Sequence, residues 1–275
     1  MQAIIAELRT ADWARSLISK INENGGIIRA NKALLFELRF GYALSQTGLH
    51  PNYEVRGEGE STIDYGFTSN SGAWAVELMR LEETDATRRA TRSETDEDGI
   101  EWSSQTLSSR GADPAQSEEG ETLKAVQRIC QKFERNGRPH KFPQPATGCW
   151  HALVVDLRTF LTARSDVFDM AHIALGGSVL TNDFHRRYWQ GQLISGVFDE
   201  RTSVRGAIEA RQRLHFLGFV NEEEYAPGQF AAGTTFFANP FLFQQIEDVR
   251  TAMATWPLQP MRVVNAHADA AIRRP

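Results

Sequence analysis

Residues 61–83, STIDYGFTSNSGAWAVELMRLEE, constrain the fold more than any other stretch of this chain. Two runs in which large apolar residues alternate with small or polar ones flank Ser69-Asn70-Ser71-Gly72, a group of residues that favours a turn. We therefore predict a β-hairpin whose strands pair symmetrically about that turn, with Tyr65 opposite Val76.

In this register one face of the hairpin is wholly apolar and is predicted to face a core: Ile63, Tyr65, Phe67, Trp74, Val76 and Leu78. The other face places Asp64 opposite Glu77, beside Gly66 and Ala75. Directly opposed residues have Cβ atoms about 5 Å apart, so two carboxylates there repel each other. A shared proton, a nearby Arg or Lys, or a divalent cation could compensate them, and the small neighbours leave room for a ligand. The alternative is a solvated face of an amphipathic hairpin, which the apolar run over residues 74–81 disfavours.

The hydrophobic spacing elsewhere predicts alternating helices and strands. Before the hairpin we expect two helices, at residues 10–24 and 30–47, and one strand at 53–56. After it we expect a helix over 121–137, closed by Gly137, and a strand buried on both faces over 151–160. Further strands, expected at residues 214–220 and 234–238, extend the sheet, and a last helix is expected at 243–254.

This order predicts an α/β protein with a mixed central β-sheet flanked by helices. We expect a single domain over residues 1–275, with a core at about 30–160 and a C-terminal extension over 161–275. Residues 84–121 hold ten acids and four arginines but few large apolar side chains, so we expect a mobile acidic insertion. The whole chain has a net charge of −5. Without that insertion the charge is close to zero, which neither demands nor excludes a polyanionic substrate.

Several classes of protein are disfavoured by the sequence. No apolar run reaches the roughly 18 residues that span a bilayer, and no leader is evident, so we expect a cytoplasmic protein without a membrane partner. The two cysteines are too few for a disulfide framework. No H-E-x-x-H, G-x-G-x-x-G or P-loop pattern occurs, which disfavours zinc proteases and nucleotide-binding folds.

A helix, a hairpin with Asp on one strand and Glu on the next, a second helix and a buried strand together resemble the PD-(D/E)XK nuclease superfamily. The resemblance covers about residues 30–160. It implies a restriction-endonuclease-like core that binds Mg²⁺ or Mn²⁺ and hydrolyses phosphodiester bonds in DNA or, less favoured, RNA. The matching metal ligands and catalytic residues are Asp64 and Glu77, with Glu37 as the glutamate that the first core helix contributes in many members.

One position departs from the family pattern. The resemblance places a lysine two residues after Glu77, but this chain has Met79 there. The next residue, Arg80, points to the opposite face of the strand. Some members take the basic group from the following helix, so we expect Lys124 to replace it as a catalytic residue, with Lys132 as the second choice. Aromatic and basic residues at 186–189 could also contact a nucleic acid strand.

Two other functions stay open. Met79 in place of lysine favours a catalytically degenerate module of the same fold that binds nucleic acid or a protein partner. A metal-dependent hydrolase of a smaller phosphoester would share the same acids. The sequence also leaves open whether the protein forms a homodimer.

Overall fold

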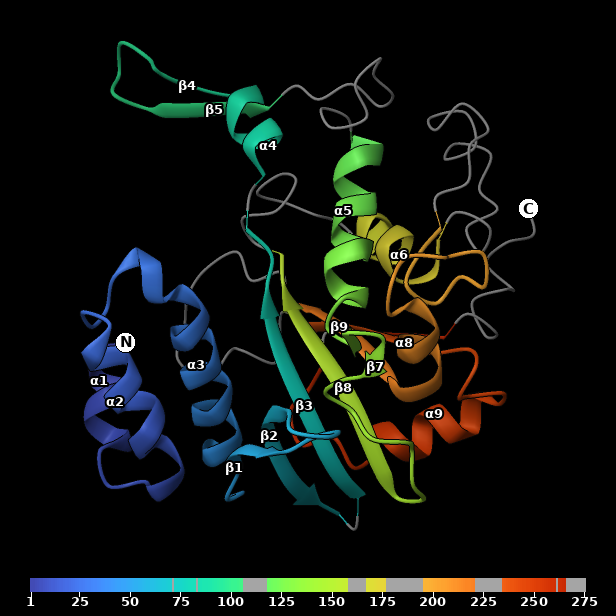
Figure 1. Ribbon diagram of the computed structural model, residues 1–275. Helices are drawn as coiled ribbons and strands as arrows, with labels where there is room; N and C mark the ends of the chain where they lie inside the picture. Colours follow the sequence, from blue (N-terminus) through green and yellow to red (C-terminus); the bar gives the residue numbers. More distant parts are fainter. Residues whose placement is uncertain are drawn as a thin grey trace.

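The computed structural model describes most of the chain, and Figure 1 shows its course. The described residues are 1–70, 72–82, 84–105, 118–157, 167–176, 195–220, 234–260 and 262–265. They form an α/β fold in which helices cover a mixed seven-stranded sheet, as the sequence predicts. No helix among these residues combines the length and the apolar character that a membrane crossing requires.

The central sheet has the strand order β1-β2-β3-β8-β9-β10-β11. Its strands are β1 (Asn52–Arg56), β2 (Thr62–Ser69), β3 (Gly72–Arg80), β8 (Cys149–Asp156), β9 (Phe216–Val220), β10 (Thr234–Ala238) and β11 (Arg262–Asn265). The strands β1, β2 and β3 form an antiparallel meander, and β3, β8 and β9 run parallel to one another. Then β10 reverses the direction and β11 runs parallel to it. The C-terminal strands therefore extend the same sheet, as predicted.

Helices pack on both faces of this sheet, over two separate apolar clusters. One face is covered by α5 (Glu118–Cys130), α6 (Val167–Leu175) and α8 (Ala207–Arg213). The other is covered by α3 (Lys32–Gln46) and α9 (Ile246–Met253). A third cluster joins α1 (Gln2–Leu8) and α2 (Arg15–Glu23) to α3. The short 3₁₀ turns Asp12–Ala14 and Arg29–Asn31 precede α2 and α3.

The hairpin of β2 and β3 has the predicted register where residues 65–69 pair with 72–76. Tyr65 pairs with Val76 and Phe67 with Trp74. All six apolar side chains of its inner face are at most 5% exposed. Five of them pack in the cluster under α3, but Ile63 belongs to the cluster on the α5 face. The pairing of β2 with β3 begins at Tyr65, so Ile63 lies beyond the part of the hairpin in which alternation fixes the face.

The helix predicted over residues 121–137 is shorter than expected. It ends at Cys130, and Leu123, assigned to its apolar stripe, is 42% exposed. Two short strands follow, β6 (Glu134–Arg135) and β7 (Arg138–Pro139). Asn136 and Gly137 between them both have positive φ. An Asn-Gly pair favours that conformation in a two-residue hairpin turn, so Gly137 closes a hairpin and not a helix.

The acidic window over residues 84–121, predicted as a mobile insertion, contains regular structure in its described part. It forms α4 (Asp85–Ala90), β4 (Thr91–Thr95) and β5 (Glu101–Gln105), and α5 begins at Glu118. Thr84 caps α4 by accepting a hydrogen bond from the backbone of Thr87, and both threonines are buried. The paired strands β4 and β5 project from the body of the molecule (Figure 1). Residues 106–117 lie outside the described part of the chain.

Candidate active site

The two hairpin acids meet at the end of the ladder between β2 and β3. Asp64 directly precedes the first paired residue of β2, and its Oδ2 accepts a hydrogen bond of 2.7 Å from the backbone N–H of Leu78. A side-chain carboxylate therefore bonds to β3 at the point where regular strand pairing stops. Burial raises the pKa of Asp64, and the charge of Glu77, next to Leu78, raises it further. Asp64 and Glu77 are therefore not the directly opposed pair of the ladder that the sequence predicts, but they lie close enough for the charge of Glu77 to act on Asp64.

Glu77 lies on the α5 face of β3 and is buried, with 1% exposure. Its two oxygens contact two lysines. Lys132, just after α5, donates to Oε1 at 3.0 Å. Lys141, which follows β7, lies 2.8 Å from Oε1 and 3.0 Å from Oε2. The face that bears Glu77 is thus an enclosed ionic site and not the solvated surface that the alternative interpretation of the hairpin required.

Lys141 is held in place by the turn between β1 and β2. Its backbone N–H donates to Oγ of Ser61, and its carbonyl accepts from the backbone N–H of Glu58. Its ammonium also donates to the carbonyl of Thr62 at 2.7 Å. Gly57 permits this close approach, because a Cβ atom there would lie 2.4 Å from the carbonyl oxygen of Lys141. The lysine is therefore positioned by backbone contacts before any ligand binds.

Glu37 reaches the same region from α3. It accepts a hydrogen bond of 2.7 Å from the hydroxyl of Tyr53 on β1. The hydroxyl of Tyr65 donates to the backbone carbonyl of Glu37 at 2.9 Å, which fixes this turn of α3 against the hairpin. Burial raises the pKa of Glu37, the Tyr53 hydrogen bond lowers it, and the charge of Glu77 raises it. The three predicted acids therefore lie close enough to interact electrostatically.

Asp64 has a strongly raised pKa. Its burial raises its pKa well above the ordinary value, and the charges of Glu77 and Glu37 raise it further. The Leu78 hydrogen bond and the charge of Lys141 act in the opposite direction. Among the described residues, only Leu78 forms a hydrogen bond with this carboxylate, through Oδ2. The negative charges of Glu77 and Glu37, which contribute to this raised pKa, also favour a cation beside Asp64.

The sequence predicts that Gly66 leaves room for a ligand beside the two acids, but the structure places another side chain there. A Cβ atom on Gly66 would lie 2.8 Å from Cγ1 of Val55, so the side chain of β1 fills the place expected for a ligand. The absence of a side chain at Gly66 serves the packing of β1 on β2. Room for a ligand on that side of the acids is therefore smaller than the sequence indicates.

The lysines that contact Glu77 are not the ones that the sequence ranks first. Lys124, the first choice, donates to Glu121 at 2.9 Å, one turn earlier in α5. Lys132, the second choice, contacts Glu77, and so does Lys141, which the sequence does not single out. Met79 packs at the edge of the cluster on the α5 face, while Arg80 lies near Asp156 at 3.6 Å.

Lys141 could not be found from a motif, because it lies in a loop 64 residues from Glu77. The only hint was local: residues 136–141, NGRPHK, combine a turn pair with a lysine. The aromatic and basic residues at 186–189 lie outside the described part of the chain.

Among the described residues, no group of three or more His, Cys, Asp or Glu side chains is arranged to hold a metal ion. Asp64 and Glu77 alone still offer the hard oxygen ligands that Mg²⁺ prefers. Because Mg²⁺ is commonly bound through only one or two carboxylates, with waters and substrate phosphates as the other ligands, these two acids fit it.

The comparisons with known proteins assign this chain to no group. No family model, curated protein or solved structure matches it.

Proposed function

We propose that this protein is a metal-dependent nuclease that hydrolyses phosphodiester bonds, with DNA favoured over RNA as the substrate. The single observation that carries the proposal is the contact of Lys141 and Lys132 with Glu77, whose charge acts on Asp64. These lysines supply the basic group that β3 lacks at Met79. Two acids and a lysine then occur together, as the resemblance to the PD-(D/E)XK superfamily implies.

The order of elements supports the same proposal. The chain passes through α3, the meander β1-β2-β3, then α5 and β8, and β8 lies parallel to β3. This order is similar to that of a restriction-endonuclease-like core, in which the acids lie on the second and third strands. Here the intervening α4 and the hairpin of β4 and β5 form an insertion between β3 and α5.

Each residue has a separate role in this proposal. Asp64 and Glu77 would hold the ion, and bound Mg²⁺ or Mn²⁺ would lower the pKa of a coordinated water and neutralise charge on the phosphate. Lys141, fixed by Ser61 and Glu58, orients the attacking water and stabilises negative charge that develops on the phosphate. Glu37, with its raised pKa, accepts a proton close to the two metal ligands.

The test is a cleavage assay with supercoiled plasmid, duplex DNA, single-stranded DNA and RNA, in Mg²⁺, Mn²⁺ or EDTA. We expect metal-dependent cleavage that falls by about 100-fold or more in Asp64→Asn and Glu77→Gln. Glu247→Gln, which changes an exposed glutamate of α9, is the matched control and should cleave like the wild type. Equal cleavage by all four proteins would overturn the proposal.

The second candidate is a degenerate nuclease-fold module that binds nucleic acid or a protein without cutting. The ion pairs themselves favour it, since both oxygens of Glu77 already contact lysine ammonium groups. In that case the lysines, and not a metal, compensate the acids. Binding of DNA that is unchanged by Mg²⁺, together with no cleavage, would favour this candidate.

A further inference from the structure

Lys141, which contacts Glu77, has an unusual backbone conformation. Its φ is 67°, in the left-handed region that residues with a side chain rarely adopt. The backbone N–H of Phe142 donates to the carbonyl of His140 at 3.0 Å, which closes a three-residue turn around Lys141. A turn of this kind with a positive φ at its centre is the rare and strained form. Such a conformation persists only where the surrounding structure holds it.

Hydrogen bonds from several parts of the chain hold this turn. Before its centre, the backbone N–H of His140 donates to the carbonyl of Phe133 at 2.8 Å. At its centre, the backbone of Lys141 is bound by the turn between β1 and β2, as described above. After its centre, the carbonyl of Phe142 accepts a hydrogen bond of 3.1 Å from Nη1 of Arg213, the last residue of α8. The turn is thus held on both sides of Lys141, and a charged side chain forms the last of these bonds.

The side chain of Arg213 is itself fixed in place. Arg213 is 5% exposed, and a buried charge of this kind requires partners. Its Nε donates to Glu209, one turn earlier in α8, at 2.6 Å, and its Nη1 lies 3.5 Å from Oε2 of Glu58. Its backbone carbonyl accepts a hydrogen bond of 2.7 Å from Nδ1 of His151 on β8. Because a guanidinium group presents several N–H donors in one rigid plane, Arg213 can bond to its own helix and to the turn at the same time.

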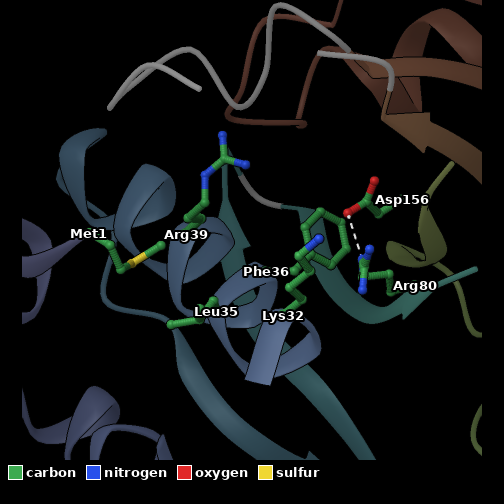
Figure 2. A pocket seen from close by; sticks show the side chains of 7 residues that line it. All are labelled: Met1, Lys32, Leu35, Phe36, Arg39, Arg80 and Asp156. Atoms are coloured by element: carbon green, nitrogen blue, oxygen red, sulfur yellow. Dashed lines mark ion pairs between the residues drawn. The ribbon is translucent and has the colours of Figure 1, made fainter. Parts of the chain in front are cut away.

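Another shielded arginine shows the contrast. Arg80, at the end of β3, lines a cavity together with Asp156, at the end of β8 (Figure 2). It pairs with Asp156 at 3.6 Å and with Glu82 at 3.0 Å, and both acids lie close to it, on the neighbouring strand and two residues further along the chain. The bond of Arg213 instead joins α8 to a carbonyl 71 residues earlier. It therefore ties a distant element to the turn that carries Lys141.

We infer that Arg213 is a positioning residue of the candidate site. By holding the carbonyl of Phe142, it keeps Lys141 in the strained turn from which the ammonium group reaches Glu77. Loss of this bond allows Lys141 to relax to a negative φ, which moves its side chain away from Glu77. The consequence for cleavage rests on the proposed nuclease function, whereas the placement of Lys141 does not.

The test compares wild type with Arg213→Met, which keeps an apolar stem but no donor, and with the conservative variant Arg213→Lys. The matched control is Arg211→Ala, because Arg211 belongs to the same helix and also donates to backbone carbonyls, but to those of the segment before α8. Placement is measured by acetylation of lysines with acetic anhydride and mass spectrometry, since Lys141 is only 16% exposed in its contact with Glu77. Catalysis is measured as kcat and KM for DNA cleavage in Mg²⁺.

We expect Lys141 to be acetylated about fivefold faster in Arg213→Met than in wild type, because the turn loses a hydrogen bond from a charged donor. Lys124 serves as the internal reference and should react equally in both proteins. The kcat should fall about tenfold with KM for DNA unchanged, because a group beside the acids is displaced and no DNA contact is removed. Arg213→Lys should recover part of both effects, and Arg211→Ala should resemble wild type.

Equal acetylation of Lys141 in wild type and Arg213→Met, or an equal increase in Arg211→Ala, would overturn the inference. An unchanged kcat in Arg213→Met would also overturn it, with the nuclease function intact. If wild type does not cut DNA, the proposed function fails, but faster acetylation of Lys141 in Arg213→Met still supports its placement by Arg213. Thermal melting shows whether each variant folds. If Arg213→Met does not fold, Arg213→Gln replaces it under the same criteria, because its shorter amide can reach Glu209 but not the turn as well.

Discussion

The ammonium group of Lys141 lies 2.8 Å from Oε1 of Glu77, although 64 residues separate them in the chain. The side chain of Glu77 is 1% exposed and that of Lys141 is 16% exposed, so the pair is largely withdrawn from water. Lys132 approaches the same carboxylate but is 34% exposed. Lys141 is therefore the better-shielded partner, and its charge also acts on Asp64.

Replacement of Lys141 tests its assigned role. Lys141→Met should lower the rate of DNA cleavage by about 100-fold, because it removes the charge positioned beside both acids. The same change should destabilise the fold by about 2 kcal/mol, since it leaves the buried Glu77 with Lys132 alone. Rates are measured at saturating DNA and stability by urea denaturation.

The lysines of α5 and its C-terminal end provide graded controls for that experiment. Lys132→Met should reduce cleavage less than Lys141→Met, because Lys132 is more exposed and contacts one oxygen of Glu77. Lys124→Met should leave cleavage near the wild-type rate, because Lys124 pairs with Glu121. A larger loss in Lys124→Met than in Lys141→Met would contradict the assignment.

The raised pKa of Asp64 makes the stability of the metal-free protein depend on pH. A folded carboxyl group whose pKa is raised binds its proton more tightly than the unfolded one, so stability is lost as pH rises above the ordinary value of 3.8. Asp64→Asn cannot ionise but keeps an oxygen for the Leu78 hydrogen bond. We expect Asp64→Asn to melt at a higher temperature than wild type at pH 7, with the difference shrinking towards pH 4. A constant difference over that range would argue against this electrostatic account.

The hydrogen bond from Tyr53 to Glu37 affects the pH dependence of catalysis. Because this bond lowers the pKa of Glu37, Tyr53→Phe should raise that pKa further. If ionised Glu37 accepts a proton during cleavage, the acidic limb of the pH–rate profile should move to higher pH in Tyr53→Phe. In Glu37→Gln the same limb should not respond to the Tyr53 change. An unmoved limb in Tyr53→Phe would exclude Glu37 from this role.

The contact of α3 with the hairpin is closely packed at Gly41. A Cβ atom there would lie 2.4 Å from the ring of Trp13 and 2.6 Å from the hydroxyl of Tyr65. Gly41→Ala should therefore destabilise the protein by about 2 kcal/mol, measured by urea denaturation. Ala33→Ser, at an exposed position of the same helix, is the control and should change stability little. Equal stability of Gly41→Ala and wild type would show that α3 can shift freely.

The sequence predicts local elements and faces well where periodicity is strong. The alternation in residues 62–68 and 73–81 correctly gives both strands, the register of residues 65–69 with 72–76 and the face that carries Glu77, but not the face of Ile63. The run at 151–160 correctly indicates a strand with both faces buried, since side chains of β8 pack into the clusters on both faces of the sheet. Residues 158–160 of that run lie outside the described part of the chain. In each case a short-range pattern determines the result.

Features that depend on contacts distant in sequence could not be predicted in this way. The approach of Lys141 to Glu77 requires the hairpin of β6 and β7 to pack against the turn before β2, which no periodicity reveals. In the acidic window, the cap of Thr84 on α4 and the burial of Thr87 are contacts that its polar composition does not reveal. The packing of Val55 over Gly66 is likewise a contact between neighbouring strands.

The most direct test of the central claim is the binding of Mn²⁺, measured by electron paramagnetic resonance on wild type, Asp64→Asn and the control Glu247→Gln. The account predicts that wild type and Glu247→Gln bind Mn²⁺ with equal affinity and that Asp64→Asn binds at least about tenfold more weakly, because one of two carboxylate ligands is lost. Equal Mn²⁺ binding in all three proteins, or none in the wild type, would contradict a metal site at Asp64 and Glu77.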